Sequence, residues 1–161
     1  MSTPQRRIAV GSDMRHPVAD GIADRLERNG CSVVRVGAVS ASATPWPDVA
    51  EQVARLVASH AVDGGVVCCW TGTGVSIAAN KVPGVRAALC GDAETARGAR
   101  RWNDANVLAL SLRASSAALA EEIVDAWLHT AGVEASEQPN IARVSAIERR
   151  YRERAVAQSV E

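Results

Sequence analysis

Short apolar segments alternate with segments of helical periodicity along most of this chain of 161 residues. Five apolar segments bounded by Gly, Ser or Asp are predicted strands, at residues 8–11, 32–36, 65–69, 85–89 and 107–110. Helices are predicted at 18–29, at 48–59 with Asp48 as N-cap, from the 71–74 turn to about 81, at 95–101, to about 129 with Ser115 or Ser116 as N-cap, and from about 141. Because strands that alternate with helices form parallel sheets covered on both faces, the pattern predicts an α/β fold. We expect a Rossmann-like three-layer α/β/α sandwich with a five-stranded parallel sheet.

The segment from Gly65 to Gly74 points most directly to chemistry. Ligands of a parallel sheet bind outside the carboxyl ends of its strands, which places Asp13 and residues 69–74 and 90–92 around one crevice. A glycine turn at a helix start offers free backbone N–H groups to an oxyanion or a phosphate. A thiol there, Cys69, is favoured as the thiolate and is suited to act as a base. A lone Gly-x-Gly also occurs in ordinary packing turns, so its spacing leaves both interpretations open.

Composition excludes several classes of protein. The formal net charge is zero and 22% of the residues are charged, so the sequence shows no nucleic-acid footprint and no polybasic membrane patch. It has no run long enough for a signal peptide or a membrane span, and we expect a cytoplasmic protein. No Cys-x-x-Cys spacing occurs, so the four cysteines, Cys31, Cys68, Cys69 and Cys90, are expected to be thiols. We expect neither a metal site nor a cofactor.

The stretch from Cys69 to Cys90, CWTGTGVSIAANKVPGVRAALC, resembles the ribose-5-phosphate isomerase B and galactose-6-phosphate isomerase family. Further matching segments are Gly11-Ser12-Asp13, Pro47-Asp48, residues 103–109 and residues 123–128. The resemblance extends over nearly the whole chain, to about Ile147. It therefore implies a sugar isomerase domain at residues 1–147, followed by a helical tail at 148–161 that contacts a partner subunit.

The resemblance implies an aldose–ketose isomerase that moves a proton between adjacent carbons through an enediolate. Cys69 matches the catalytic cysteine of the family. Some members use a Glu in the following helix turn, and this chain has Val75 there, so the cysteine version applies. The other matched positions are Thr71, Gly72 and Gly74 in the loop that stabilises the oxyanion, and Asp13 and Asn103 at substrate hydroxyls. We count Thr71 with Cys69 as catalytic.

Departures from the family pattern concern ring opening and phosphate binding. The ring-opening His of the family is Trp102 here, and an indole N–H only donates a hydrogen bond and transfers no proton. The His after the first Asp is Met14 here, which leaves His16 nearby to refill the phosphate site. The tail motif of the family keeps one of its arginines, Arg143, and Arg113 is also retained. Arg113, Arg143 and His16 are therefore the expected phosphate-binding residues.

Tryptophans replace smaller or more polar family residues at two further positions. Trp70 stands where the family usually has Gly, and Trp46 where it often has Tyr. With Trp102, three of the four tryptophans map to the crevice, whereas Trp127 is expected in the core. They either narrow the pocket or offer aromatic faces to a less polar ligand.

Three functions fit these residues. The first is an isomerase of a small sugar or sugar phosphate in which Cys69 transfers the proton and ribose 5-phosphate is not the preferred substrate. The second is a non-catalytic or partner subunit of a heteromeric isomerase, which the loss of His at Trp102 favours. The third is a repurposed enzyme of a specialised biosynthetic pathway, which the Trp-rich pocket favours. Since Trp102 removes the ring-opening group, an open-chain substrate such as a tetrose phosphate is expected in the first case.

We expect a homodimer or homotetramer whose active sites are shared between subunits, with the arginines after Asn140 reaching the partner. No nucleic acid or membrane is an expected partner. Successive residues of a strand point to opposite faces of the sheet. Only one of two neighbouring thiols can therefore face the site, and we expect this to be Cys69, with Cys68 buried in the core.

Overall fold

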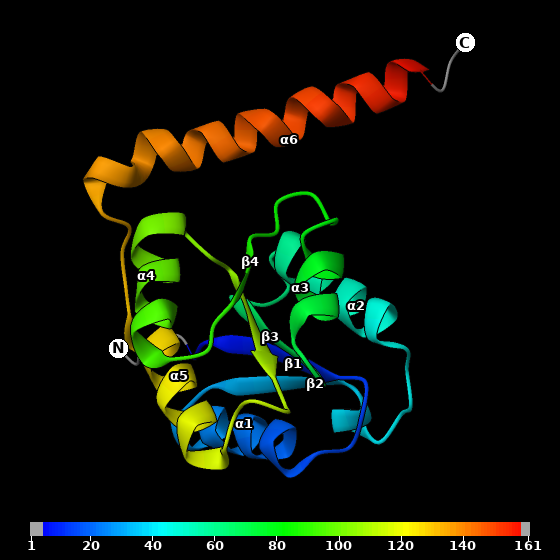
Figure 1. The fold of residues 1–161 in the computed structure, drawn as a ribbon, viewed down its shortest axis with the longest axis vertical. Helices are drawn as coiled ribbons and strands as arrows, with labels where there is room; N and C mark the ends of the chain where they lie inside the picture. The colour runs from blue at the N-terminus through cyan, green and yellow to red at the C-terminus, as the bar shows by residue number, and fades with distance from the viewer. Residues whose placement is uncertain (1–4, 159–161) are drawn as a thin grey trace.

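The computed structural model describes residues 5–158, which form one parallel sheet covered by helices on both faces (Figure 1). The strands lie in the order β2-β1-β3-β5-β4. Their bounds are β1 Arg7–Ser12, β2 Ser32–Gly37, β3 Gly64–Cys69, β4 Ala87–Leu89 and β5 Val107–Ser111. The helices are α1 Pro17–Arg28, α2 Trp46–Ala58, α3 Thr73–Ala79, α4 Ala93–Asn103, α5 Ala117–His129 and α6 Gln138–Gln158, with short 3₁₀ turns at Ala38–Ser40 and Ala135–Glu137. The predicted three-layer α/β/α fold is confirmed.

The two faces of the sheet carry separate hydrophobic clusters. Helices α1, α4 and α5 pack on one face, where Ile22, Leu26 and Ile123 are buried against Val66. Helices α2 and α3 cover the other face, on which Val67 is buried. Because both faces are covered, the central strands consist of consecutive apolar residues instead of alternating apolar and polar ones.

Several predicted helix boundaries differ from the observed ones, including both ends of α4, which spans Ala93–Asn103 instead of 95–101. Asp48 is not the N-cap of α2, because the helix already begins at Trp46 and Asp48 lies in its first turn. Pro47 explains the early start, since its fixed φ suits the first turn of a helix. Helix α3 ends at Ala79 instead of Lys81, and α6 begins at Gln138 instead of residue 141. For α5 the N-cap is Ser116, whose hydroxyl accepts a hydrogen bond from the N–H of Leu119 at 3.1 Å.

Strand β4 starts two residues later than predicted, because asparagine side chains bind the backbone that precedes and opens it. The Asn106 carboxamide accepts a hydrogen bond from the N–H of Arg86 at 2.7 Å. Asn80 accepts from the N–H of Ala87 at 2.8 Å and donates to the carbonyl of the same residue at 2.8 Å. Asparagine side chains therefore bind the backbone of Arg86 and Ala87, and only Ala87–Leu89 pair with β5 in the sheet.

Helix α6 lies across one end of the sheet and has no buried residue (Figure 1). The carboxylate of Glu148 accepts a hydrogen bond from the N–H of Gly84, which ties the helix to the α3–β4 loop. A groove of about 720 Å³ separates α6 from β4, and Val144, Ile147 and Tyr151 line it. The helix runs without a break past residue 147, so the division that we expect after this residue stays a prediction. Within residues 5–158, no helix is long and apolar enough to cross a bilayer.

The packing of β3 against α2 should be sensitive to one added methyl group. A Cβ on Gly65 would lie 2.5 Å from Cγ1 of Val53, so we expect Gly65→Ala to lower the free energy of unfolding by about 1–3 kcal/mol. Gly21→Ala is the matched control, because no atom lies within 4 Å of a Cβ at that helical position. It should raise the stability by about 0.5–1 kcal/mol. Urea denaturation of both variants and the wild-type protein measures the difference. If Gly65→Ala were as stable as the wild-type protein, α2 and β3 would accommodate the added methyl group without loss of stability, which contradicts the prediction.

Candidate active site

The order in which the chain adds strands to the sheet changes sides between β1 and β3, which are neighbours in the sheet. From β1 it continues to β2 on one side, and from β3 it continues toward β4 on the other. Such a switch point opens a crevice at the carboxyl ends of the two strands, where ligands of this fold bind. Ser12 pairs with Cys68 in the parallel register. Asp13, the next residue after β1, therefore lies beside Cys69, the last residue of β3.

The two neighbouring thiols of β3 occupy opposite faces of the sheet, as predicted. Cys68 is fully buried in the cluster formed with α1, α4 and α5. Cys69 belongs to the cluster formed with α2 and α3, and 6% of its surface is exposed at the end of the strand. Burial raises the pKa of the Cys68 thiol to about 12. Cys68 is therefore an inert packing residue, and Cys69 is the thiol that the strand carries to the crevice.

Asp13 brings a carboxylate to the crevice with one oxygen unoccupied. Its Oδ1 is buried and has no hydrogen-bond partner within residues 5–158. Burial raises the pKa of this carboxyl above its ordinary value of 3.8, against the lowering effect of the N–H groups of Asp13 and Met14. The turn is fixed by Ser12, whose hydroxyl donates to the carbonyl of Met14 at 2.8 Å. An unpaired buried oxygen is costly unless a ligand or a water molecule bonds to it.

The loop that follows Cys69 rests on the end of β5. Gly72 has a φ of +74°, which favours glycine, and a Cβ there would lie 2.9 Å from the carbonyl oxygen of Leu110. The carbonyl of Cys69 accepts a hydrogen bond from the N–H of Leu112 at 3.0 Å. The carbonyl of Trp70 accepts one from the N–H of Arg113 at 2.9 Å. Residues 69–72 therefore have a fixed backbone, which a positioned set of N–H donors requires.

Two of the predicted tryptophans stand at this edge of the sheet. The indole of Trp46 covers Gly74, since a Cβ at that glycine would lie 3.1 Å from Cε3 of the ring. Half of the Trp70 surface is exposed, at 50%, at the tip of the loop, and Trp46 is 42% exposed. A side chain at position 74 would therefore crowd the Trp46 ring. Large apolar surfaces flank the crevice.

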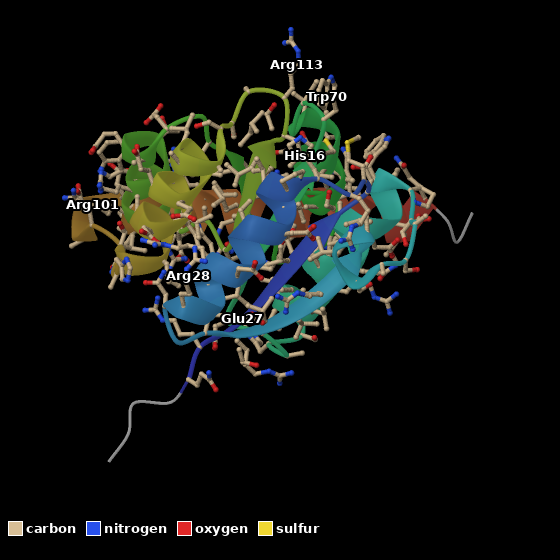
Figure 2. The ribbon with its side chains drawn as sticks, turned by 90° about the horizontal axis from the view of Figure 1, so that it is seen from below. His16, Glu27, Arg28, Trp70, Arg101 and Arg113 are labelled. Carbon is tan, nitrogen blue, oxygen red and sulfur yellow. The ribbon has the colours of Figure 1, made fainter. Side chains whose placement is uncertain are left out.

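Two of the predicted phosphate-binding residues, His16 and Arg113, lie at the same end of the molecule but in different surroundings (Figure 2). Figure 2 shows His16, Trp70 and Arg113 at one end of the molecule, with Arg113 extending away from the body. His16 is the N-cap of α1, and its Nδ1 accepts a hydrogen bond from the N–H of Val18 at 3.2 Å. This capping position was not foreseen, although Pro17, a favoured residue at the first position of a helix, is the signal for a helix start there. The hydrogen bond at Nδ1 thus fixes the His16 ring at the start of α1.

Trp102 and Asn103 lie away from the crevice of their own chain, and Arg143 belongs to α6, next to Val144 in the groove that Asn103 lines. Helix α4 runs back from the end of β4, so its last residues lie at the amino edge of the sheet. There Arg86, just before β4, donates a hydrogen bond to the carbonyl of Asp104 at 2.6 Å, and Asn103 lines the groove beneath α6. The Trp102 ring folds back onto its own helix, since a Cβ on Gly98 would lie 2.6 Å from it. Within one chain the three tryptophans therefore do not meet, and their meeting in a crevice completed by a second chain stays a prediction.

Sequence reasoning missed two residues that contact the loop. Ser111 donates a hydrogen bond to the carbonyl of Trp70 at 3.0 Å, and Leu89 lies over Gly72. Only the register between strands that are not adjacent in sequence reveals these contacts. Among the residues that the structure describes, no group of three or more His, Cys, Asp or Glu is placed to hold a metal ion.

Comparison with known proteins places this geometry in a family. Residues 8–147 match the family described as Ribose/Galactose Isomerase. The chain belongs to the ribose/galactose isomerase family. It is 40% identical over 150 residues to the ribose-5-phosphate isomerase B of Escherichia coli (strain K12), a match that covers 90% of this chain and 98% of that protein.

Two further similarities bear on fold and substrate within the ribose/galactose isomerase family. The chain is 38% identical over 123 residues to the D-erythrulose-4-phosphate isomerase of Pectobacterium atrosepticum, which covers 75% of this chain and 81% of that protein. The structure of the Clostridium thermocellum ribose-5-phosphate isomerase B superposes with a TM-score of 0.85 at 40% identity, covering 90% of this chain and 99% of that one. These relatives are sugar phosphate isomerases, and the expected family, fold and class of enzyme are confirmed.

Thiol reactivity should separate the cysteines of this isomerase. Burial raises the pKa of Cys90 to about 11 and that of Cys68 to about 12, so both stay protonated at neutral pH. Only thiolates react with iodoacetamide at a useful rate. We therefore expect Cys69 to be modified first at pH 7, while Cys68 and Cys90 react only as the pH rises well into the alkaline range. Peptide mass spectrometry after timed quenching measures the order, and equal or inverted labelling of Cys68 and Cys69 contradicts it.

Proposed function

We propose that this protein is an aldose–ketose isomerase of a short, open-chain sugar phosphate, with Cys69 as the base that transfers the proton. The observation that carries this proposal is the meeting of Cys69, the open oxygen of Asp13 and the rigid loop 70–72 at the switch point of the sheet. A base, a group for substrate hydroxyls and a set of backbone donors are what an enediolate reaction requires.

These groups and the substrate's own hydroxyl account for each proton that the reaction moves. The Cys69 thiolate removes a proton from the carbon next to the carbonyl, and the electron pair of that C–H bond moves into the developing enediolate. Backbone N–H groups of the loop stabilise the negative oxygen, and the Thr71 hydroxyl lies in the same loop, 2.7 Å from that of Thr73. The proton of the adjacent substrate hydroxyl passes to the enediolate oxygen, and the thiol returns its proton to the neighbouring carbon. Asp13 orients the substrate hydroxyls through its free oxygen.

Trp102 supports an open-chain substrate. Pentose and hexose phosphates are mostly closed rings, and an isomerase that acts on them needs a group to open the ring. The indole of Trp102 supplies no such proton. A four-carbon sugar phosphate cannot close the usual ring, because its terminal oxygen is esterified. One relative is named D-erythrulose-4-phosphate isomerase, and the sugar phosphate in its name is a substrate of this kind.

The remaining cationic groups suit a single phosphate. Arg113 and His16 lie at the same end of the molecule as Trp70 (Figure 2). Arg143 is proposed as a further contact. Hydrogen bonds from Arg to phosphate are charge-assisted and among the stronger polar contacts. Trp46 and Trp70 fill the volume beside the loop, which favours a shorter carbon chain.

We further propose a homodimer or homotetramer in which each site combines residues of two chains. Asn103 lies at the opposite edge of the sheet from Cys69, and Arg143 lies on α6 next to Val144, which lines the same groove as Asn103, so one chain does not bring Asn103 and Cys69 to one ligand. A two-fold axis makes both edges available to both sites at once. The apolar side chains of α6, Val144, Ile147 and Tyr151, are exposed and suit contact with a second copy. A cytoplasmic location, as for other enzymes of sugar phosphate metabolism, belongs to the same proposal.

Substrate preference provides the direct test of the open-chain proposal. We expect kcat/KM for D-erythrulose 4-phosphate to exceed that for ribose 5-phosphate by about tenfold or more, since this ratio measures differential binding of the transition state. Coupled assays with both substrates give the comparison. Trp102→His should raise turnover of ribose 5-phosphate by restoring a ring-opening group. A wild-type preference for ribose 5-phosphate would refute the ring-opening argument, and no turnover of any aldose or ketose phosphate would refute the isomerase proposal.

Mixing two inactive variants tests whether the site is shared. Cys69→Ala removes the base, which is worth about 10²–10⁴-fold in rate, and Asn103→Ala removes a proposed contact on the other chain. In heterodimers formed by co-expression, one site keeps both residues. A statistical mixture should therefore regain about a quarter of the wild-type activity. The same variants expressed separately and mixed without subunit exchange are the control. Persistent inactivity of the co-expressed pair, or a monomer in light scattering, would overturn the shared site.

A further inference from the structure

The peptide between Trp70 and Thr71 is held more firmly than its place in an exposed loop requires. Its carbonyl oxygen accepts two hydrogen bonds, from the hydroxyl of Ser111 at 3.0 Å and from the N–H of Arg113 at 2.9 Å. Ser111 is the last residue of β5 and pairs with Cys69 in the parallel register. Its hydroxyl oxygen also accepts a hydrogen bond from the N–H of Ala114 at 3.1 Å. The hydroxyl proton is therefore committed to Trp70.

This attachment decides where the next amide points. A trans peptide is planar and carries its N–H and C=O on opposite sides, and the described residues contain no cis peptide. Because the carbonyls of Cys69 and Trp70 both bind to the β5 side, the N–H groups of Trp70 and Thr71 point away from β5. Strand β1 flanks β3 on that side, and the buried Oδ1 of Asp13 lies there without a partner. Within residues 5–158, neither N–H has a hydrogen-bond partner.

We propose that Ser111 is a positioning residue, which fixes the Trp70–Thr71 peptide so that the Thr71 N–H faces the oxyanion formed during isomerisation. The inference rests on the proposed function and adds a residue outside the crevice to it. A donor held in place before the reaction stabilises developing charge without reorganisation, and removal of one such donor costs about 10²–10³-fold in kcat. Ser111 acts through the peptide and touches no substrate. Its loss leaves the hydrogen bond from Arg113, so a smaller effect is expected.

Two substitutions at one position and one matched control test the assignment. Ser111→Ala should lower kcat about 5–20-fold with KM changed less than about twofold, whereas Ser111→Thr keeps a hydroxyl and should restore most of the rate. Ser116→Ala removes a hydroxyl of similar hydrogen-bond length, the cap of α5, 3.1 Å from the N–H of Leu119. It should lower the melting temperature without changing kcat.

Inhibitor binding separates positioning from general loosening of the loop. An aldonohydroxamate phosphate carries an oxygen pair like that of the enediolate, and the alditol phosphate of the same length does not. In Ser111→Ala the affinity for the hydroxamate should fall by the same factor as kcat/KM, while that for the alditol phosphate stays unchanged, because only the reacting state uses the donor. Equal weakening of both inhibitors, failure of Ser111→Thr to restore turnover, or wild-type kinetics in Ser111→Ala would each overturn the inference. Inactivity of the wild-type protein would instead refute the proposed function.

Discussion

The hydrogen bonds between the end of β3 and the end of β5 are the constraint on which the candidate site depends. Strand β3 lies between β1 and β5, with apolar clusters on both faces. Its position in the sheet is thereby determined, and its last residue, Cys69, ends at a fixed point beside Asp13. Beyond that point the chain would be free to move, but the carbonyls of Cys69 and Trp70 bind to residues 111–113. A loop made largely of Thr and Gly therefore keeps one shape.

The direction of the helices places the candidate site residues at two opposite edges of the sheet. Each helix that follows a strand returns along the sheet, so its last residues reach the amino edge. Helix α4 accordingly carries Trp102 and Asn103 away from the edge at which its preceding strand ends. Within one chain the thiol and the end of α4 are separated by the length of the sheet. The fold of one chain therefore brings together only the Cys69 thiol, the Asp13 carboxyl and the loop, which is why the proposed site includes a second chain.

The fold was predictable from sequence because its signals are local. Hydrophobic runs of 65–69 and 107–110 found β3 and β5 within one residue at each end. The start of α2 was missed because Asp48 is a good N-cap by composition, whereas Pro47 allows an earlier turn. Cys69 and Asp13 were placed together correctly, since both follow from the carboxyl ends of parallel strands. Ser111 was not predictable, because its contact depends on the register of two strands that are 38 residues or more apart in sequence.

The two hydrogen bonds between the Asn80 carboxamide and the backbone of β4 also matter for contacts between molecules in concentrated solution. Strand β4 is an edge strand, and the N–H and C=O of Ala87 point outward from the sheet. Both are occupied by the Asn80 carboxamide, at 2.8 Å each. Unpaired edges are templates on which a strand of another molecule adds, and natural proteins blunt them. A single amide side chain here imitates a neighbouring strand for one residue, so the sheet offers a foreign strand little to extend. At Ala87, one of the three residues of β4, this edge of the sheet is therefore closed to a strand of another molecule.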